Sequence, residues 1–227
     1  MTAPRQLPLP LPHEPSFARE DFLAAPSNAA ALALIESWPR WPAPLMLLVG
    51  PSGAGKSHLA AIFAQVSGAR RLAGRDLATL DPDEASRGPA LALDDADDAG
   101  DAEAAFFHLL NFARARGVAM LLTARAAPDL WGLSTPDLLS RLRLAPIVEI
   151  APPEPELVEA VLAKLFSDRQ MSVEPSLLAY IARRLDRSLG AARALVEALD
   201  AEALAQGRKV TRAMAAALLS GGAEGDS

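Results

Sequence analysis

The sequence predicts an α/β protein: a doubly wound parallel sheet with helices on both faces, followed by a small all-helical domain. Three observations predict this fold. Short apolar runs of strand length alternate with helical segments up to residue 150. The first run, Leu45–Val49, leads into a glycine-rich loop and then a helix. After the proline-rich segment Ala151–Glu156, only helical periodicity remains.

The expected strands are continuous apolar runs, which are typical of parallel strands buried on both faces. They are Leu45–Val49, Pro89–Leu93, Val118–Thr123 and Ile147–Ile150, with Ala69–Leu72 as a candidate short fifth. Four helices are expected in this part of the chain. The first is capped by Ser27 or Asn28 and runs to Ser37, the second covers 58–68, and the third covers Ala102–Arg116. The fourth begins at Thr135, where Pro136 suits the first helical turn.

The second domain is expected to contain four helices. They are Leu157–Phe166, Pro175–Leu185, Gly190–Ala205 and Thr211–Leu219. The expected division of the chain is a disordered arm (1–15), a nucleotide-binding α/β domain (16–150), a helical lid domain (151–220) and a disordered tail (221–227).

Composition narrows the function classes. The chain has 227 residues, a formal net charge of −6 and no cysteine, so disulfides and thiolate chemistry are excluded. Its three histidines stand far apart, which predicts no histidine metal cluster. The acidic balance argues against a free-standing nucleic-acid-binding domain. The apolar runs are too short to cross a bilayer and no signal peptide is recognisable, so we expect a cytoplasmic protein without a membrane partner.

A phosphate-binding loop is the strongest motif in the chain. Gly50–Ser57 matches G-x-x-x-x-G-K-[ST] at every position, between a predicted strand and a predicted helix. The glycines let backbone N–H groups face a phosphate, and the following helix adds its positive N-terminal end. Lys56 would reach the β- and γ-phosphates, and Ser57 would ligate Mg²⁺. The residues expected to contact ADP or ATP are Pro51, Ser52, Gly53, Ala54, Gly55, Lys56, Ser57 and His58.

Carboxylates close the second apolar run. A phosphate loop needs an acidic residue at the end of a neighbouring strand to hold the metal ion. Asp94 is expected to orient Mg²⁺, directly or through water, and Asp95 is a candidate to orient an attacking water molecule. The alternative is a solvated acidic loop, which we expect for Asp97, Asp98 and Asp101.

With both motifs placed, the chain resembles the AAA+ ATPases, and within them the bacterial replication initiator DnaA, over roughly residues 16–219. The stretch Ser16–Ile35 is similar to the DnaA segment that forms part of the adenine pocket. Ser134–Leu142 is similar to the segment that carries the family's arginine finger, which maps onto Arg141. Ala191–Asp200 resembles the lid helix that carries the second sensor arginine, which maps onto Arg193.

Each arginine also has a plainer interpretation. Arg141 could be a surface residue at a helix end, where a cation is favourable, and Arg143 competes for the finger role. Arg193 could pair with Glu197 one helical turn away. One position departs from the family pattern: Arg125 stands where the first sensor is usually acidic, which implies weak intrinsic hydrolysis of ATP.

The N-terminal arm carries the remaining motif. Gln6, Leu7, Leu9 and Leu11 alternate with prolines, and this stretch resembles a peptide that binds the DNA polymerase sliding clamp. Proline keeps such an arm extended, which lowers the entropy lost on docking. The alternative is a proline-rich terminus without a partner.

The combination resembles the DnaA-related Hda family, negative regulators of replication initiation. The resemblance stops before the basic helix-turn-helix domain with which DnaA reads origin DNA, so no sequence-specific DNA binding is expected. It implies that the protein binds adenine nucleotide and the DNA-loaded sliding clamp, and stimulates ATP hydrolysis on its partner DnaA; a homodimer is left open. The alternatives are a helicase-loader ATPase of the DnaC type and a catalytically silent nucleotide-binding scaffold.

Overall fold

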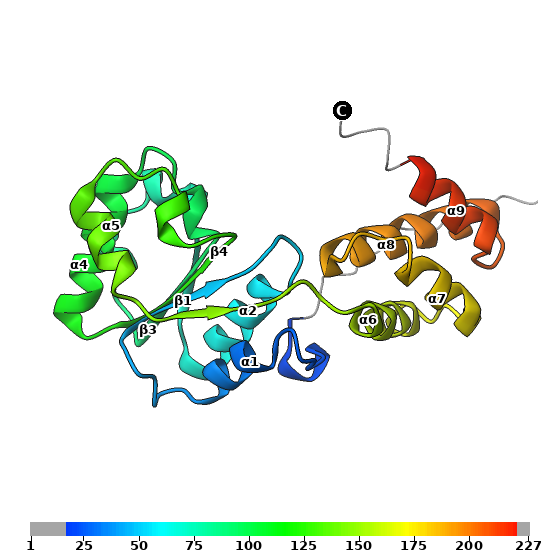
Figure 1. Cartoon of the computed structure of the whole chain (residues 1–227), viewed down its shortest axis with the longest axis horizontal. Helices are drawn as coiled ribbons and strands as arrows, with labels where there is room; N and C mark the ends of the chain where they lie inside the picture. The colour runs from blue at the N-terminus through cyan, green and yellow to red at the C-terminus, as the bar shows by residue number, and fades with distance from the viewer. Residues whose placement is uncertain (1–16, 222–227) are drawn as a thin grey trace, which may run out of the picture.

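The computed structural model describes residues 17–221 (Figure 1). A sheet flanked by helices forms one half of the molecule, and four helices form the other half, on the right in Figure 1. The α/β fold with a parallel sheet is confirmed. The arm residues Gln6, Leu7, Leu9 and Leu11 lie outside the described residues.

Five parallel strands form the sheet in the order β2-β3-β4-β1-β5. They are β1 (Leu45–Val49), β2 (Arg70–Ala73), β3 (Ala90–Asp94), β4 (Ala119–Ala124) and β5 (Ile147–Glu149). The four predicted apolar runs and the short fifth candidate are therefore strands. Strand β3 begins one residue after Pro89, which has no N–H to donate to a ladder. Because β4 pairs with both β1 and β3, the carboxyl ends of these three strands adjoin one another.

Helices cover both faces of the sheet. The helices of this half are α1 (Ala29–Glu36), α2 (Lys56–Ser67), α3 (Pro82–Ala85), α4 (Glu103–Arg116) and α5 (Pro136–Arg143). Ile35 of α1 and Phe63 of α2 are buried in one core with Leu48 of β1. Phe106 of α4 and Leu142 of α5 are buried in a second core on the other face. Alternate residues of β1 supply both cores, as the continuous apolar run predicted.

The start of α1 differs from the expected side-chain cap. Asn28 occupies the cap position and is buried, but its side chain bonds the preceding loop, accepting from the Ala25 N–H at 2.9 Å and donating to the Leu23 carbonyl at 3.0 Å. Ser27 instead donates its backbone N–H and its hydroxyl to the Glu154 carboxylate, both at 2.8 Å. These contacts tie the N-terminal segment to the start of the helical half.

The helical half has its own core. It comprises α6 (Pro155–Asp168), α7 (Pro175–Ala182), α8 (Leu189–Gln206) and α9 (Arg212–Gly221). Buried side chains from all four helices, among them Phe166, Ile181, Val196 and Met214, form one cluster separate from the two cores of the sheet half. Helix α7 ends three residues earlier than expected, because the N–H groups of Arg184 and Leu185 converge on the Ile181 carbonyl and close the helix in a tight turn.

Short 3-10 segments complete the description. They are Arg19–Asp21, Gly74–Thr79, Ala96–Asp98 and Pro128–Leu130, and periodicity did not predict them because each is at most two turns long. Within residues 17–221, no helix combines the length and apolar character that crossing a bilayer requires.

Candidate functional site

The phosphate-binding loop links β1 to α2. Gly53 and Gly55 adopt positive φ angles of 71° and 104°, which glycine tolerates without strain. Gly53 also lies against the start of α8: an added Cβ would come within 1.9 Å of the Ser188 hydroxyl, and the Gly53 carbonyl accepts from the Leu189 N–H at 2.8 Å. The helical half therefore touches the loop directly.

Lys56 is the first residue of α2 and is buried, with 5% of its surface exposed. Its ammonium donates to the Gly50 carbonyl at 2.8 Å and to the Pro51 carbonyl at 3.0 Å. Burial lowers the pKa of Lys56, while the carboxylates of Asp95, Asp97 and Asp94 oppose that shift. The cation is thus held under the loop by neutral carbonyls, where a bound phosphate would supply a stronger partner.

A cavity of about 800 Å³ lies between the two halves, beside the loop. The loop lines it with Ser52, Gly53, Gly55, Lys56 and Ser57, and His58 follows on α2. Of the other two residues expected to contact nucleotide, Pro51 is exposed and Ala54 is buried in one of the two cores of the sheet half. Neither of these two side chains lines the cavity.

His58 joins the cavity to the N-terminal segment. Its ring contacts Phe17 and Phe22 edge-on, with centroids 5.3 and 5.2 Å away, and its Nε2 lies 2.9 Å from the Ala18 carbonyl. Because a carbonyl only accepts, Nε2 carries the proton. Burial lowers the pKa of His58, so the ring is neutral at pH 7. The aromatic side chains provide one apolar wall, which suits a flat heterocycle.

The helical half supplies the opposite wall. Val161, Lys164 and Leu165 of α6 and Arg193 of α8 line the cavity. Lys164 forms an ion pair with Asp21 of the N-terminal segment at 2.7 Å. The Arg193 guanidinium lies 5.3 Å from the centroid of the Phe17 ring. The alternative pairing of Arg193 with Glu197 is absent within residues 17–221, where Glu197 pairs with Arg169 instead.

Two carboxylates stand where β3 ends. Asp94, whose side chain is 16% exposed, accepts a hydrogen bond from the Thr123 hydroxyl and faces Arg71 at 3.6 Å. Asp95 follows with a positive φ of 49° and lines the cavity. Burial, reinforced by the neighbouring Asp94, raises the pKa of Asp95. An acid next to the loop with a raised pKa fits a proton acceptor for water more closely than a solvated surface residue does.

The expectation of a solvated loop at Asp97 and Asp98 is wrong for Asp97. Its side chain is only 8% exposed, and its Oδ2 accepts from the Arg125 Nε at 2.7 Å and from the Arg125 backbone N–H at 3.2 Å. Asp98 pairs with the same guanidinium. Asp98 and Arg125 line the cavity, so the atypical cation sits beside the phosphate loop and is neutralised there by two acids.

Arg141 lies outside the cavity. Its guanidinium donates to the Asn111 side chain and lies 4.4 Å from the centroid of the Phe107 ring, so α4 holds it. It lines a second hollow with Leu45 and Val118, at the ends of β1 and β4 opposite the phosphate loop. The competing Arg143 pairs with Asp129 on the surface. The structure therefore brings Arg193 to the site, but not Arg141.

The donor set beside the loop fits a magnesium ion. The Ser57 hydroxyl and the Asp95 carboxylate line the cavity, and Asp94 directly precedes Asp95 without lining it. All three offer oxygen atoms, which are the ligands Mg²⁺ prefers, and Mg²⁺ takes its other ligands from phosphates and water. Within residues 17–221, no group of three or more His, Asp or Glu side chains forms a metal site by itself. The residues thus fit a cation that arrives with a phosphate ligand.

Sequence reasoning missed Thr123. Its buried hydroxyl donates to Asp94 and accepts from the Asp95 N–H at 2.9 Å, so it orients both candidate acids. A polar residue at the end of the apolar run Val118–Thr123 was the available signal. Only the order of the strands places that residue next to β3.

Comparison with solved structures identifies the fold. Domain III of the replication initiation protein DnaA from Thermotoga maritima superposes with a TM-score of 0.78 at 20% identity, over 91% of this chain and 97% of that one. The replication initiator DnaA bound to AMPPCP and single-stranded DNA gives 0.69 at 16% identity, over 86% and 68%. A RuvB variant from T. maritima gives 0.64 at 18% identity, over 84% and 66%. The fold is the AAA+ fold of DnaA domain III.

Sequence comparison adds little to this. No protein-family model matches the chain. A stretch of 58 residues is 48% identical to the mycobactin import ATP-binding/permease protein IrtA of Mycolicibacterium smegmatis. That match spans 24% of this chain and 7% of the transporter, so the activity of the transporter does not carry over.

Proposed function

We propose that this protein is an Hda-like AAA+ regulator of replication initiation. It binds ADP or ATP between its two halves, docks on the DNA-loaded sliding clamp through its N-terminal arm, and stimulates ATP hydrolysis on DnaA with Arg141. Its intrinsic ATPase is weak, and it acts mainly on its partner.

Nucleotide binding rests on the phosphate loop. The loop positions Lys56, Ser57 and the positive end of α2 at one edge of a cavity whose other walls carry aromatic side chains. Arg193 stands at the same cavity from the helical half, where a second cation would contact phosphate. Structural neighbours bound to AMPPCP support an adenine nucleotide as the ligand.

Mg²⁺ would reach this site with the nucleotide, held by Ser57 and Asp94, and would neutralise charge on the phosphates. Asp95, whose pKa burial raises, is placed to orient and deprotonate water at the same edge. Arg125 forms ion pairs with Asp97 and Asp98, so these two carboxylates largely neutralise its charge. An incomplete set of cations at the site agrees with slow hydrolysis by the isolated protein.

The position of Arg141 carries the regulatory part of the proposal. The arginine lies near the amino-terminal ends of β1 and β4, whereas its own phosphate loop follows the carboxyl end of β1. It is therefore unsuited to act on its own nucleotide. Asn111 and Phe107 pre-orient it, which lowers the entropy lost when it contacts a phosphate. An arginine supplied from another molecule stabilises the transition state of phosphoryl transfer.

The test is an assay with DnaA that carries labelled ATP, clamp-loaded DNA and this protein. We expect Arg141→Ala to retain nucleotide affinity and to reduce stimulation of hydrolysis by about 10³–10⁵, the effect of losing an arginine finger. Arg143→Ala, two residues away, serves as the control and is expected to retain full stimulation. Full activity of Arg141→Ala would place the finger elsewhere.

Two other functions remain for comparison. A helicase loader of the DnaC type would use the same nucleotide site but would not need the clamp peptide. A silent scaffold would bind nucleotide and leave hydrolysis on DnaA unchanged in the same assay.

A further inference from the structure

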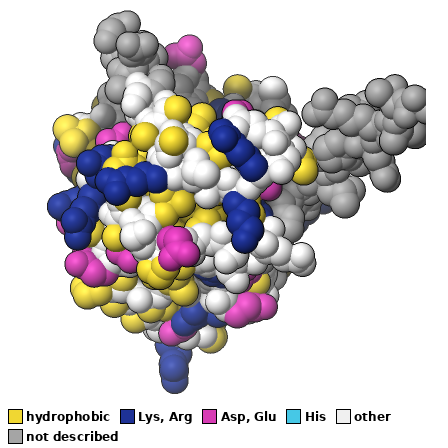
Figure 2. All heavy atoms as spheres, turned by 90° about the vertical axis from the view of Figure 1, so that its right-hand side faces the viewer, with side chains coloured by type: hydrophobic (Ala, Val, Ile, Leu, Met, Phe, Trp, Pro, Cys, Tyr) yellow, Lys and Arg dark blue, Asp and Glu magenta, His cyan; other side chains and the backbone are white. Residues whose placement is uncertain are grey.

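The far end of the helical half carries a group of cations that the nucleotide site does not use. We call Arg183, Arg184, Arg208, Lys209 and Arg212 the basic lid surface. They come from the end of α7 and from the turn that leads into α9. All five side chains are exposed. Figure 2 looks onto this end, where Lys and Arg side chains stand at several places, with acidic and hydrophobic side chains between them.

Tyr180 joins the two parts of this surface. The Arg184 guanidinium lies 4.0 Å from the centroid of its ring and the Arg212 guanidinium lies 4.1 Å from it. The ring therefore holds two cations, one from the turn after α7 and one from the start of α9, close together despite their like charge. Stacking engages the flat faces of a guanidinium and leaves its N–H edges available for an anion.

Internal acids do not neutralise these cations. Within residues 17–221, none of the five forms an ion pair, whereas Arg87, Arg116, Arg125 and Arg143 in the sheet half all do. Residues 183–212 contain seven Lys and Arg against four Asp and Glu, although the whole chain has a formal net charge of −6. Two of those four acids, Glu197 and Asp200, face Arg169 instead.

We infer that the basic lid surface binds the phosphate backbone of duplex DNA without reading its sequence. Arginine is suited to phosphate because its N–H groups form paired hydrogen bonds with phosphate oxygens. An acidic protein is the competing partner. Among the exposed large apolar side chains of the described residues, Val66, Leu130, Leu144 and Ile147 belong to the sheet half, and Leu204 lies four residues before Arg208. A set of cations that form no ion pair within residues 17–221, two of them held by one ring, matches the uniform negative charge of a phosphate backbone, so a duplex is the partner that we infer.

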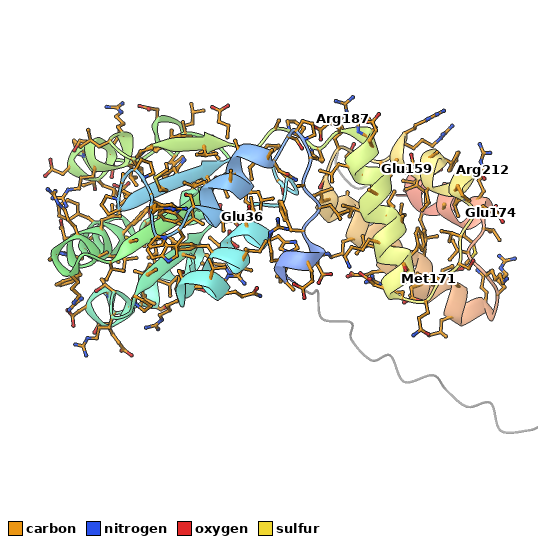
Figure 3. All side chains as sticks on the ribbon, turned by 90° about the horizontal axis from the view of Figure 1, so that it is seen from below. Glu36, Glu159, Met171, Glu174, Arg187 and Arg212 are labelled. Atoms are coloured by element: carbon orange, nitrogen blue, oxygen red, sulfur yellow. The ribbon has the colours of Figure 1, made fainter. Side chains whose placement is uncertain are left out.

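The surface extends toward the nucleotide site. In Figure 3, Arg212 lies on the outer part of the helical half and Arg187 lies closer to the sheet half, and both side chains extend outward. Arg187 immediately precedes Ser188, whose hydroxyl lies against Gly53 of the phosphate loop. A DNA backbone that runs along this path would pass the helical half without entering the cavity.

The experiment measures fluorescence anisotropy of a labelled 30-base-pair duplex of arbitrary sequence with the full chain and no other protein. We expect binding that weakens between about 50 and 200 mM salt, with a log–log slope of about −3 to −4.5 for up to five phosphate contacts. The triple variant R183A/R184A/R212A is expected to bind at least about tenfold more weakly and to lose about 2 to 3 from the magnitude of that slope.

A charge-matched control separates the effect of this surface on DNA binding from the effect of the protein's net charge. Arg40, Arg70 and Arg114 are exposed arginines of the sheet half that form no ion pair within residues 17–221. The variant R40A/R70A/R114A removes the same charge and is expected to keep the slope. Unchanged ADP affinity in the lid variant shows that the protein is folded, so failure here is distinct from failure of the nucleotide site.

Three results with the duplex would overturn the inference. They are no binding of the duplex by the parent protein at about 50 mM salt, an unchanged slope in the lid variant, and an equal loss in the control variant. Polyglutamate that binds more tightly than the duplex would overturn it in favour of an acidic protein partner.

Discussion

Lys56 is a buried cation whose position is unfavourable in the unliganded protein and suited to binding a phosphate. Its ammonium is buried, its pKa is lowered by that burial, and its hydrogen bonds go to two carbonyls of its own loop. Although carboxylates lie nearby, a buried cation whose hydrogen-bond partners are all neutral is unfavourable, so an anionic ligand is expected to stabilise it. The loop thus holds the Lys56 ammonium at the point where a phosphate would lie.

We expect Lys56→Ala to weaken ADP and ATP binding by about 30-fold or more, because about 2 kcal/mol or more of charge-assisted hydrogen bonding is lost. Isothermal titration calorimetry measures this directly. Lys209→Ala, which removes an exposed lysine far from the loop, is the control and should bind normally. Equal affinities of the two variants would contradict the assignment of the site.

At the scale of elements, Glu103 connects α4 with α5. Its carboxylate accepts from the N–H groups of Ser134 and Thr135, both at 2.7 Å, and from the Ser134 hydroxyl at 3.0 Å. These bonds hold the two residues that directly precede α5, the helix that carries Arg141, against the first turn of α4. They lower the pKa of Glu103 from 4.5 to about 2.

A carboxyl group with a lowered pKa stabilises the fold above its unfolded-state pKa, and that contribution disappears as the pH falls toward the folded value. Glu103→Gln should therefore reduce the free energy of unfolding by about 1 kcal/mol at pH 7, the usual net contribution of an intramolecular hydrogen bond. The difference from the parent should shrink as the pH falls from about 5 toward about 2. Urea unfolding across this range measures it.

The exposed Glu20 provides the matched control. Glu20→Gln should change stability by less than about 0.5 kcal/mol, which is usual for surface substitutions. A Glu103→Gln effect that stays constant with pH would mean that the carboxylate charge does not strengthen the connection between α4 and α5.

At the scale of the whole molecule, the nucleotide cavity lies between two halves with separate cores. The Ser27–Glu154 and Lys164–Asp21 contacts and the contact of Gly53 with α8 hold the halves together. The expected clamp peptide precedes all of these contacts in the chain. Binding to the clamp and binding to nucleotide should therefore be separable.

Replacing both Gln6 and Leu9 by alanine is expected to abolish retention on immobilised sliding clamp while leaving ADP affinity unchanged. The physical reason is that the clamp peptide offers one amide and a few leucine side chains, so losing two of them removes most of its anchors. His13→Ala lies outside the motif and should retain clamp binding. Normal retention of the double variant would assign the arm another role.

From the sequence alone, the local features of this protein could be predicted. Continuous apolar runs identified the strands, and the spacing of Gly50–Ser57 identified the phosphate loop, because both patterns act over a few neighbouring residues. Arg193 was placed at the site through a resemblance. Asn28 was expected only as a helix cap, because a side chain that bonds the preceding loop leaves no periodic signal.

Only the tertiary structure decided the contacts between distant segments. The strand order places Thr123 of β4 beside Asp94. The neighbouring ends of β3 and β4 also bury Asp97 against Arg125, although the sequence alone predicted that Asp97 is solvated. The tertiary structure also separates Arg141 from its own loop and brings Arg184 and Arg212 onto one ring. Burial and charge pairing depend on which surfaces pack together, and a linear pattern carries that information only weakly.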